Sequence, residues 1–120
     1  MPEPQAGVNQ LLIDARILAL EPLRYTPAGV PVVTCSLAHE SMQDEAGQQR
    51  TASVELQAVA AGELANVLGG ASLGMWIRGA GFLTAKSLRS RVPVLHLNKI
   101  EFLEGNENGF QAQIKVQEEG

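Results

Sequence analysis

Apolar and polar residues alternate along several stretches of the chain, with the period of two that is typical of half-buried β-strands. The alternation is clearest in residues 30–39, where Val33, Cys35 and Leu37 are expected to face one side and Thr34 and Ser36 the other. Three further stretches are bounded by Gly, Pro or polar turn residues and show the same tendency: residues 50–60, 73–84 and 92–103. Residues 9–20 could form a helix by composition, but the turn signals that follow at once, at residues 21–22 and 26–29, favour a strand. The pattern predicts five strands.

Two of these strands carry more detailed signals. In the last strand the apolar parity changes from Leu95 and Leu97 to Ile100 and Phe102, which indicates a β-bulge near Asn98. In the third strand, four residues are expected to face the core: Ala52, Val54, Leu56 and Ala58. The polar segment that precedes this strand, residues 43–49, is expected to be a loop.

A short helix is predicted between the third and fourth strands. Residues 62–68 place Leu64, Val67 and Leu68 on one face, and Gly69-Gly70 follows as a C-terminal stop. Three strands, a short helix and two further strands are the order of the five-stranded OB-fold barrel. The sequence therefore predicts an all-β OB-fold barrel, with an open sheet packed on one helix as the alternative.

The chain is short enough for a single domain. We expect residues 1–8 to be a flexible leader and residues 9–104 to form the OB-fold domain. Residues 105–120 are expected to be a C-terminal extension, either an extra strand or a disordered acidic tail.

Charge is distributed unevenly along the chain. The net charge is -4, yet residues 64–100 contain no Asp or Glu and hold five of the nine basic residues. Three of these five, Lys86, Arg89 and Arg91, lie within six residues, between the fourth and fifth predicted strands. In an OB-fold this loop commonly contacts the ligand. The pattern predicts a local anion-binding surface, and a solvated loop tip is the alternative.

Three residues of the fourth predicted strand extend this surface. Arg78 shares strand parity with Trp76 and Phe82, on the side opposite the expected core. Barrels that bind single-stranded nucleic acid combine cations for the backbone with aromatic rings for the bases. We therefore predict Arg78, Trp76 and Phe82 as further DNA-binding residues. The alternative is that both rings cover the core at the barrel rim or a dimer interface.

Signs of catalysis are lacking in the sequence. His39 and His96 do not stand in a metal-ligand spacing with the lone Cys35, and no nucleophile arrangement has its third group. We expect no enzymatic activity, no cofactor and no metal. No apolar run approaches the length of a membrane span, and no signal peptide or cysteine pair is present, so a cytoplasmic protein is expected.

Two segments of the chain are the most specific: Thr-Pro-Ala-Gly-Val-Pro at residues 26–31 and Leu-Ala-His-Glu at residues 37–40. Further segments accompany them in order: residues 9–13, 22–25, 43–47, 81–83, 94–97 and 100–101. With these segments the sequence resembles primosomal replication protein N, the PriB family, from about Asn9 to Glu104.

The resemblance implies a bacterial, cytoplasmic homodimer that acts in replication restart. It implies binding to single-stranded DNA, to the primosomal helicase and to other primosome proteins, without catalysis. Lys86, Arg89 and Arg91 match the cationic DNA-binding loop of the family. Ser53 stands where strong binders have tryptophan, and Gln48 lies near a second aromatic position.

We therefore expect a primosome accessory protein that binds DNA weakly. The alternative is a general single-stranded DNA-binding protein, which needs stacking residues. The sequence leaves the dimer surface open between an exposed strand edge and the first strand, with Leu11, Ile13 and Ile17.

Overall fold

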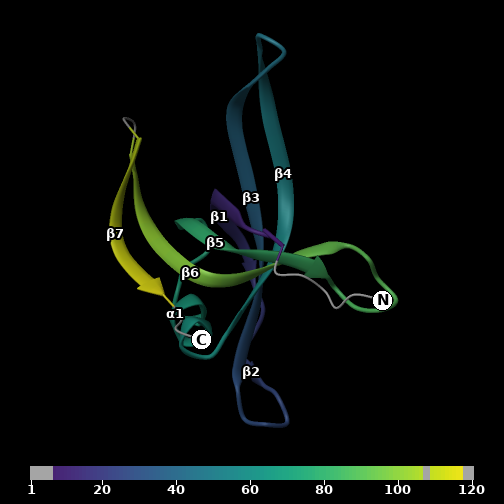
Figure 1. Ribbon diagram of the computed structural model, residues 1–120. Coiled ribbons are helices and arrows are strands. Elements are labelled where there is room, and N and C mark those ends of the chain that lie inside the picture. Colours follow the sequence, from purple (N-terminus) through teal and green to yellow (C-terminus); the bar gives the residue numbers. More distant parts are fainter. Residues whose placement is uncertain (1–6, 107–108, 118–120) are drawn as a thin grey trace.

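The computed structural model describes residues 7–106 and 109–117, with the side chains of residues 7–103. Most of the predicted leader lies outside the described residues. Eight elements follow one another along the chain (Figure 1): β1 (Leu11–Leu20), β2 (Arg24–Tyr25), β3 (Pro31–Glu45), β4 (Gln48–Ala61), α1 (Glu63–Gly69), β5 (Trp76–Ala85), β6 (Pro93–Asn106) and β7 (Gly109–Gln117).

Five of the strands form a closed sheet. Hydrogen bonding runs in the order β1-β5-β6-β4-β3, and an additional pairing of β1 with β3 closes the ring. The link between β4 and β6 is parallel and short, and joins Ala58 to Leu95 and Val59 to His96. Helix α1 lies between the third and fourth of these strands along the chain, where it was predicted. The all-β OB-fold prediction is confirmed.

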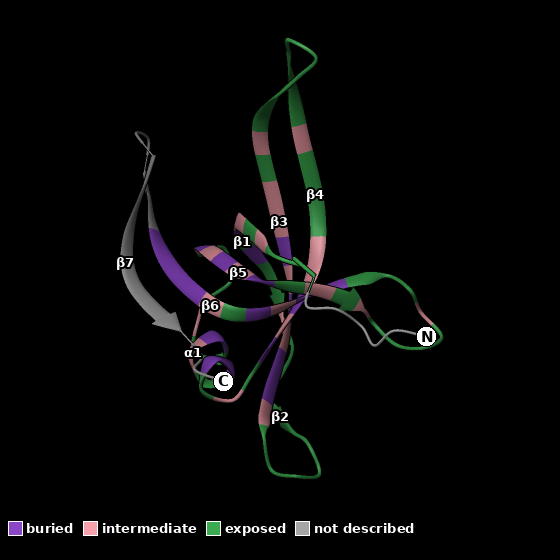
Figure 2. Cartoon of the chain, viewed as in Figure 1, coloured by how far each residue is buried: buried purple, intermediate pink, exposed green. Residues whose placement is uncertain are grey.

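The core occupies the crossing point of the strands and the inner side of α1 (Figure 2). Val33, Cys35 and Leu37 are at most 2% exposed, as the alternation predicted. From α1, Leu64 and Leu68 are fully buried beneath the sheet. Each large aliphatic side chain that is fully buried stabilises the fold by about 1.5–3 kcal/mol, so this cluster dominates stability.

The predicted bulge in the last strand is confirmed. Ala80 pairs with Lys99 while Gly81 pairs with Leu97, which leaves Asn98 as an extra residue in β6. This insertion allows Leu97 and Ile100, three residues apart, both to be buried. The two strands approach closely here, because a Cβ on Gly81 would lie 1.9 Å from the His96 carbonyl oxygen.

Strands β3 and β4 extend into a long arm beyond the barrel (Figure 1). The prediction of a loop at residues 43–49 is wrong, since only Ala46 and Gly47 separate the strands. Both have positive φ, 55° and 80°, which is the geometry of a tight hairpin turn. The core ends below the arm, so Val54, predicted to be buried, is 46% exposed.

At the C-terminal end, β7 pairs antiparallel with β6 and places Lys115 opposite Glu101. Strand β7 is thus an extra strand in the segment where the sequence left a strand and a disordered tail open. The division of the chain into leader, domain and extension stays a prediction. The fourth predicted strand begins at Trp76 rather than Leu73, after a turn in which Gly74 has φ 88°.

Candidate nucleic-acid interface

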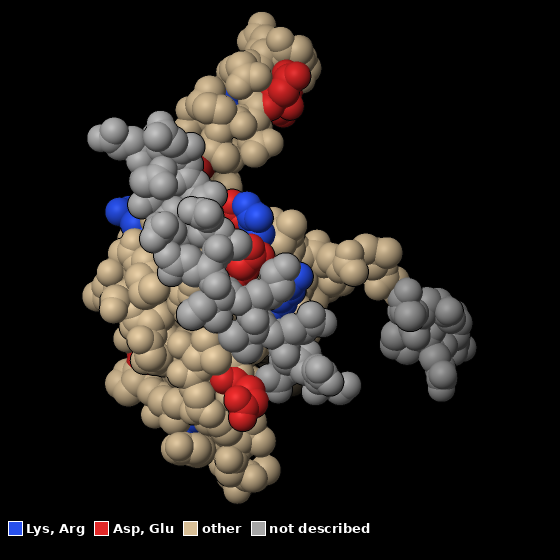
Figure 3. Space-filling model, turned by 90° about the vertical axis from the view of Figure 1, so that its left-hand side faces the viewer, with Lys and Arg blue, Asp and Glu red and all other residues tan. Residues whose placement is uncertain are grey.

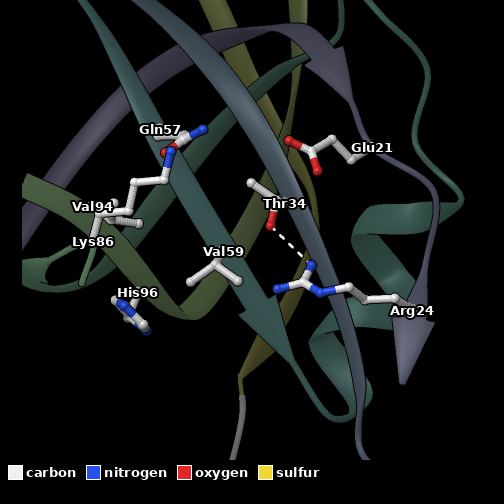
Figure 4. Close-up of a pocket in the computed structure, with 8 residues that line it drawn as sticks. All are labelled: Glu21, Arg24, Thr34, Gln57, Val59, Lys86, Val94 and His96. Atoms are coloured by element: carbon white, nitrogen blue, oxygen red, sulfur yellow. Dashed lines mark hydrogen bonds between the residues drawn. The ribbon is translucent and has the colours of Figure 1, made fainter. Parts of the chain in front are cut away.

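A groove of about 390 Å³ lies on the outer face of the barrel (Figure 4). The segment from β1 to β2 borders it on one side, and the start of the β5–β6 loop borders it on the other. In OB-folds these two connections and the strands between them form the usual ligand face. Eight residues line the groove: Glu21, Arg24, Thr34, Gln57, Val59, Lys86, Val94 and His96.

A row of outward residues crosses four strands at this groove. Thr34 of β3 pairs with Val59 of β4, Val59 pairs with His96 of β6, and His96 pairs with Phe82 of β5. We call these four residues the outer row. Neighbouring strands lie about 4.8 Å apart, so the row spans about 14 Å. It forms a continuous track across the strands.

Two cations lie at opposite sides of the groove. The Arg24 guanidinium donates a hydrogen bond to Thr34 Oγ1 at 3.2 Å, while Lys86 enters from the start of the β5–β6 loop beside Gln57 (Figure 4). Glu21 is the carboxylate among the lining residues. Two cations spanning an uncharged floor suit a chain of phosphates better than a single small anion.

The predicted basic loop, residues 86–91, continues from the groove. Its base is closed by a hydrogen bond from the Lys86 amide to the Val92 carbonyl, at 2.9 Å. Ser87 Oγ accepts hydrogen bonds from the amides of Arg89 and Ser90, at 3.2 and 2.9 Å, which shapes the turn. Arg89 and Arg91 are exposed. The loop therefore presents its cations to solvent from a defined turn.

Arg78 has a different environment. Its Nε and one terminal nitrogen donate hydrogen bonds to the two oxygens of Asp14 on β1, at 2.6 and 2.9 Å. This hydrogen bonding, and then the charge of Asp14, raise the pKa of Arg78 above its ordinary value. Glu101 of β6 lies opposite Arg78 in the sheet register and is buried. Neighbouring acids thus compensate the charge of Arg78.

Trp76 lies near Arg78 rather than near the loop. It lines a hollow with Arg16, Glu40 and Glu55 at the base of the arm. From Arg78 to Lys86 the chain advances eight residues, about 26 Å of extended strand. The six predicted site residues therefore fall into two regions. Lys86 lines the groove, Phe82 adjoins it through its pairing with His96, and Arg89 and Arg91 lie in the loop that continues from Lys86. Trp76 and Arg78 do not line this groove.

His39 lies in the same region as Trp76 and Arg78. Its Nδ1 is 2.7 Å from the Asp14 carbonyl oxygen, and its Nε2 is 2.7 Å from Ser41 Oγ. A carbonyl only accepts, so Nδ1 carries the proton and Nε2 accepts from the Ser41 hydroxyl. Gln43 donates to the same hydroxyl oxygen at 2.8 Å. The histidine thus connects β1 to the arm as a structural link.

Viewed from the side of β7, the surface shows basic and acidic side chains close together rather than one basic field (Figure 3). Acidic side chains also mark the projecting arm, where Asp44 and Glu45 precede the turn. Arg50 pairs with Glu45 at 2.7 Å. The concentrated cationic segment predicted from the sequence is the basic loop, where three cations lie within six residues.

In the part of the chain that the structure describes, no group of three or more His, Cys, Asp or Glu side chains could hold a metal ion. Burial raises the pKa of the Cys35 thiol to about 12, which keeps it protonated and unreactive at neutral pH. Within the same residues, no helix is long and apolar enough to cross a membrane.

Several residues of the groove escaped the sequence-based prediction, namely Arg24, Thr34, Gln57, Val59 and His96. The outward parity of Thr34 was visible, and His96 lies between the inward Leu95 and Leu97. Parity alone does not show which outward positions of four different strands align. That alignment depends on the register across β3, β4, β6 and β5.

Comparison with known proteins identifies the family. Residues 9–99 match the sequence model of a family described as another single-strand binding protein family. The replication restart protein PriB of Neisseria meningitidis serogroup B (strain ATCC BAA-335 / MC58) is 39% identical over 100 residues, which cover 82% of this chain and 99% of that protein.

Solved structures agree. The protein priB of Ralstonia solanacearum superposes with a TM-score of 0.73 at 33% identity, covering 80% of this chain and 98% of that one. The Plasmodium falciparum SSB, solved in complex with ssDNA, has a TM-score of 0.64 at 14% identity, covering 79% and 90% of the two chains, a likeness of fold alone. The chain therefore belongs to the family of the replication restart protein PriB.

Proposed function

We propose that this protein binds single-stranded DNA through the outer groove and the basic loop, as an accessory protein in replication restart. The observation that carries the proposal is the position of Lys86 and Arg24. They flank the outer row on the usual ligand face of the fold, and the basic loop adds Arg89 and Arg91. Membership of the PriB family supports the same assignment.

The number of free cations supports weak, salt-dependent binding. Four cations, from Arg24 and the basic loop, are available for phosphates on this face. For single strands, the slope of log Kobs against log salt concentration is about -0.7 per phosphate contact, so four contacts give a slope of about -3. The arm adds little attraction, because Asp44 and Glu45 lie at its tip.

The proposal is tested by replacing Lys86, Arg89 and Arg91 together with alanine. Fluorescence-anisotropy titration with an oligothymidylate should show weaker binding and a salt slope less negative by about 2. Glu45→Ala with Arg50→Ala is the matched control, because it removes an exposed ion pair on the arm and leaves the groove intact. An unchanged affinity and slope in the triple variant would contradict the assignment of the loop.

A homodimer in the cytoplasm is the second part of the proposal. In the described portion of the chain, residues 11–16 of β1 pair with β5, and β1 pairs with β3 only from Arg16 onward. Residues 11–15 of β1 therefore have one edge without a paired strand among the described residues, and Leu12 in this segment is 68% exposed. A second copy pairing there would cover both, whereas Ile17, at 1% exposed, belongs to the core.

Light scattering tests the dimer. The wild-type protein is expected at twice the mass of one chain, and Leu12→Glu is expected to give monomers because it places a charge in the interface. A monomeric wild type would contradict this part.

The primosomal helicase and other primosome proteins are the proposed partners, on the support of the family. A pull-down of the helicase with and without single-stranded DNA tests this assignment. Failure to retain the helicase in both conditions would contradict it.

A further inference from the structure

Two aromatic rings stack on the outer surface of the barrel. Phe82 of β5 pairs with His96 of β6, and their ring centroids lie 5.2 Å apart at an interplanar angle of 10°. Parallel rings at this distance are in an offset-stacked arrangement. Phe82 is 42% exposed, so the pair lies at the surface rather than in the core.

The ring pair continues the floor of the groove. His96 lines the groove and pairs with Val59 on one side, and Phe82 lies on its other side in the outer row. Lys86 follows Phe82 by four residues and lines the same groove (Figure 4). An aromatic surface and a cation therefore adjoin on the same face.

The core does not require these rings. The inner side of the same two strands is filled by Leu95 and Leu97, which are at most 6% exposed, with Leu83 packed against them. The backbone holds the pair in register, because Gly81 packs against the His96 carbonyl and the bulge at Asn98 begins just beyond. The rings are thus held in place while one of them keeps much of its surface in water.

We propose that Phe82 and His96 form a stacking platform for a nucleobase of single-stranded DNA, with the neighbouring phosphates at Lys86 and Arg24. The inference rests on the proposed function and adds His96 to it as a binding residue. It also supplies the aromatic contact that Ser53 on the arm does not provide. Stacking on aromatic side chains accepts every base, because each base has a π-face.

The test compares an oligothymidylate with an abasic oligonucleotide of equal length, by fluorescence anisotropy. The wild type is expected to bind the oligothymidylate about tenfold more tightly, from stacking of one base. The double variant Phe82→Leu with His96→Gln should lose this preference and keep the affinity for the abasic strand and the salt slope. Phe82→Tyr with His96→Phe, the matched control, keeps two rings and should keep the preference.

The outcomes separate the two proposals. Equal affinity of the wild type for both strands, or an unchanged preference in the double variant, would overturn the platform while leaving DNA binding in place. No binding of the wild type to either strand would overturn the proposed function and the platform together.

A measurement on the wild type removes the dependence on folding of the variants. In NMR spectra, the ring protons of Phe82 and His96 should shift upfield with the oligothymidylate and stay in place with the abasic strand. Ring signals that do not respond to the oligothymidylate would overturn the platform even if the double variant fails to fold.

Discussion

Two regions of the barrel surface carry cations from the acid-free stretch of the sequence, residues 64–100, and in one of them Arg24 joins from outside that stretch. At the groove, Lys86 and Arg24 lie on either side of an uncharged floor, Glu21 is the carboxylate among the lining residues, and the loop arginines are exposed. Around Arg78, strand pairing brings Asp14 from β1 and Glu101 from β6 to the same guanidinium. The difference teaches that an acid-free segment of sequence is not an acid-free surface, because a sheet places distant residues side by side.

The largest expected effect is a loss of fold stability from a substitution beside the groove. Gly81→Ala would place a Cβ 1.9 Å from the His96 carbonyl oxygen, which neither backbone can avoid without moving β6. We expect a loss of about 3 kcal/mol or more in the free energy of unfolding, measured by urea denaturation.

Gly79→Ala is the matched control, on the same strand and closer to the Arg78 region. Its Cβ would meet the end of the Leu97 side chain at 2.8 Å, and a side chain can rotate away. The loss should therefore be clearly smaller than at Gly81. Equal losses at the two positions would show that the approach of the backbones at Gly81 is not limiting.

Two variants with smaller effects distinguish a cation that stabilises the fold, Arg78, from one that contacts DNA, Lys86. Arg78→Ala removes the ion pair with Asp14 and should cost about 1 kcal/mol of stability, because both side chains are partly exposed and screened by water. Lys86→Ala should leave stability nearly unchanged and make the salt slope of DNA binding less negative by about 0.7.

Denaturation curves and salt titrations on the same two variants check this separation. A changed salt slope in Arg78→Ala would show that Arg78 contacts phosphates despite its pairing with Asp14, and would remove the contrast between the regions.

An effect that is absent at neutral pH and grows only above about pH 8 uses the core beneath both regions as a common reference. Burial raises the pKa of Cys35 to about 12, so the folded protein keeps a proton that the unfolded chain releases near pH 8.5. The Cys35 contribution to stability is therefore constant below about pH 8 and falls as the pH rises above it, by up to about 1.4 kcal/mol per unit. Cys35→Ala should lack this component in denaturation curves measured from pH 8 to 10.

Reaction of Cys35 with a thiol reagent then distinguishes local from global damage. It should stay slow in Lys86→Ala and Arg78→Ala and become faster in Gly81→Ala, where the fold is destabilised. Fast labelling of the folded wild type would contradict the buried environment of the thiol.

The sequence predicted the barrel well where one face of a strand is buried. Val33, Cys35 and Leu37 alternate because the core lies on one side, and the change of parity at Asn98 located the bulge. The arm escaped prediction because solvent surrounds it on both sides. Residues 43–49 therefore have no apolar face and resemble a loop, although the backbone pairs throughout except at the turn.

The site was predicted in part for a different reason. The basic loop is local, so its cations are visible in six consecutive residues. The groove combines Arg24, Val59 and His96, which lie up to 72 positions apart in the chain and meet through strand register. For the same reason the pairing of Arg78 with Asp14, 64 residues away, was not predictable from charge patterns.

The bulge at Asn98 also governs which changes in length the chain tolerates. Inserting one residue beside Asn98 would turn Ile100 and Phe102 out to water and Glu101 into the core, because each residue moved along a strand changes sides. Deleting Asn98 would instead remove the extra residue and leave Leu97, Lys99 and Ile100 in regular alternation, with Ile100 still facing the core. In the arm, removing one residue from each strand next to the turn shortens the hairpin and leaves the barrel register unchanged. We expect natural insertions in this family to concentrate at the arm and to avoid the middle of β6.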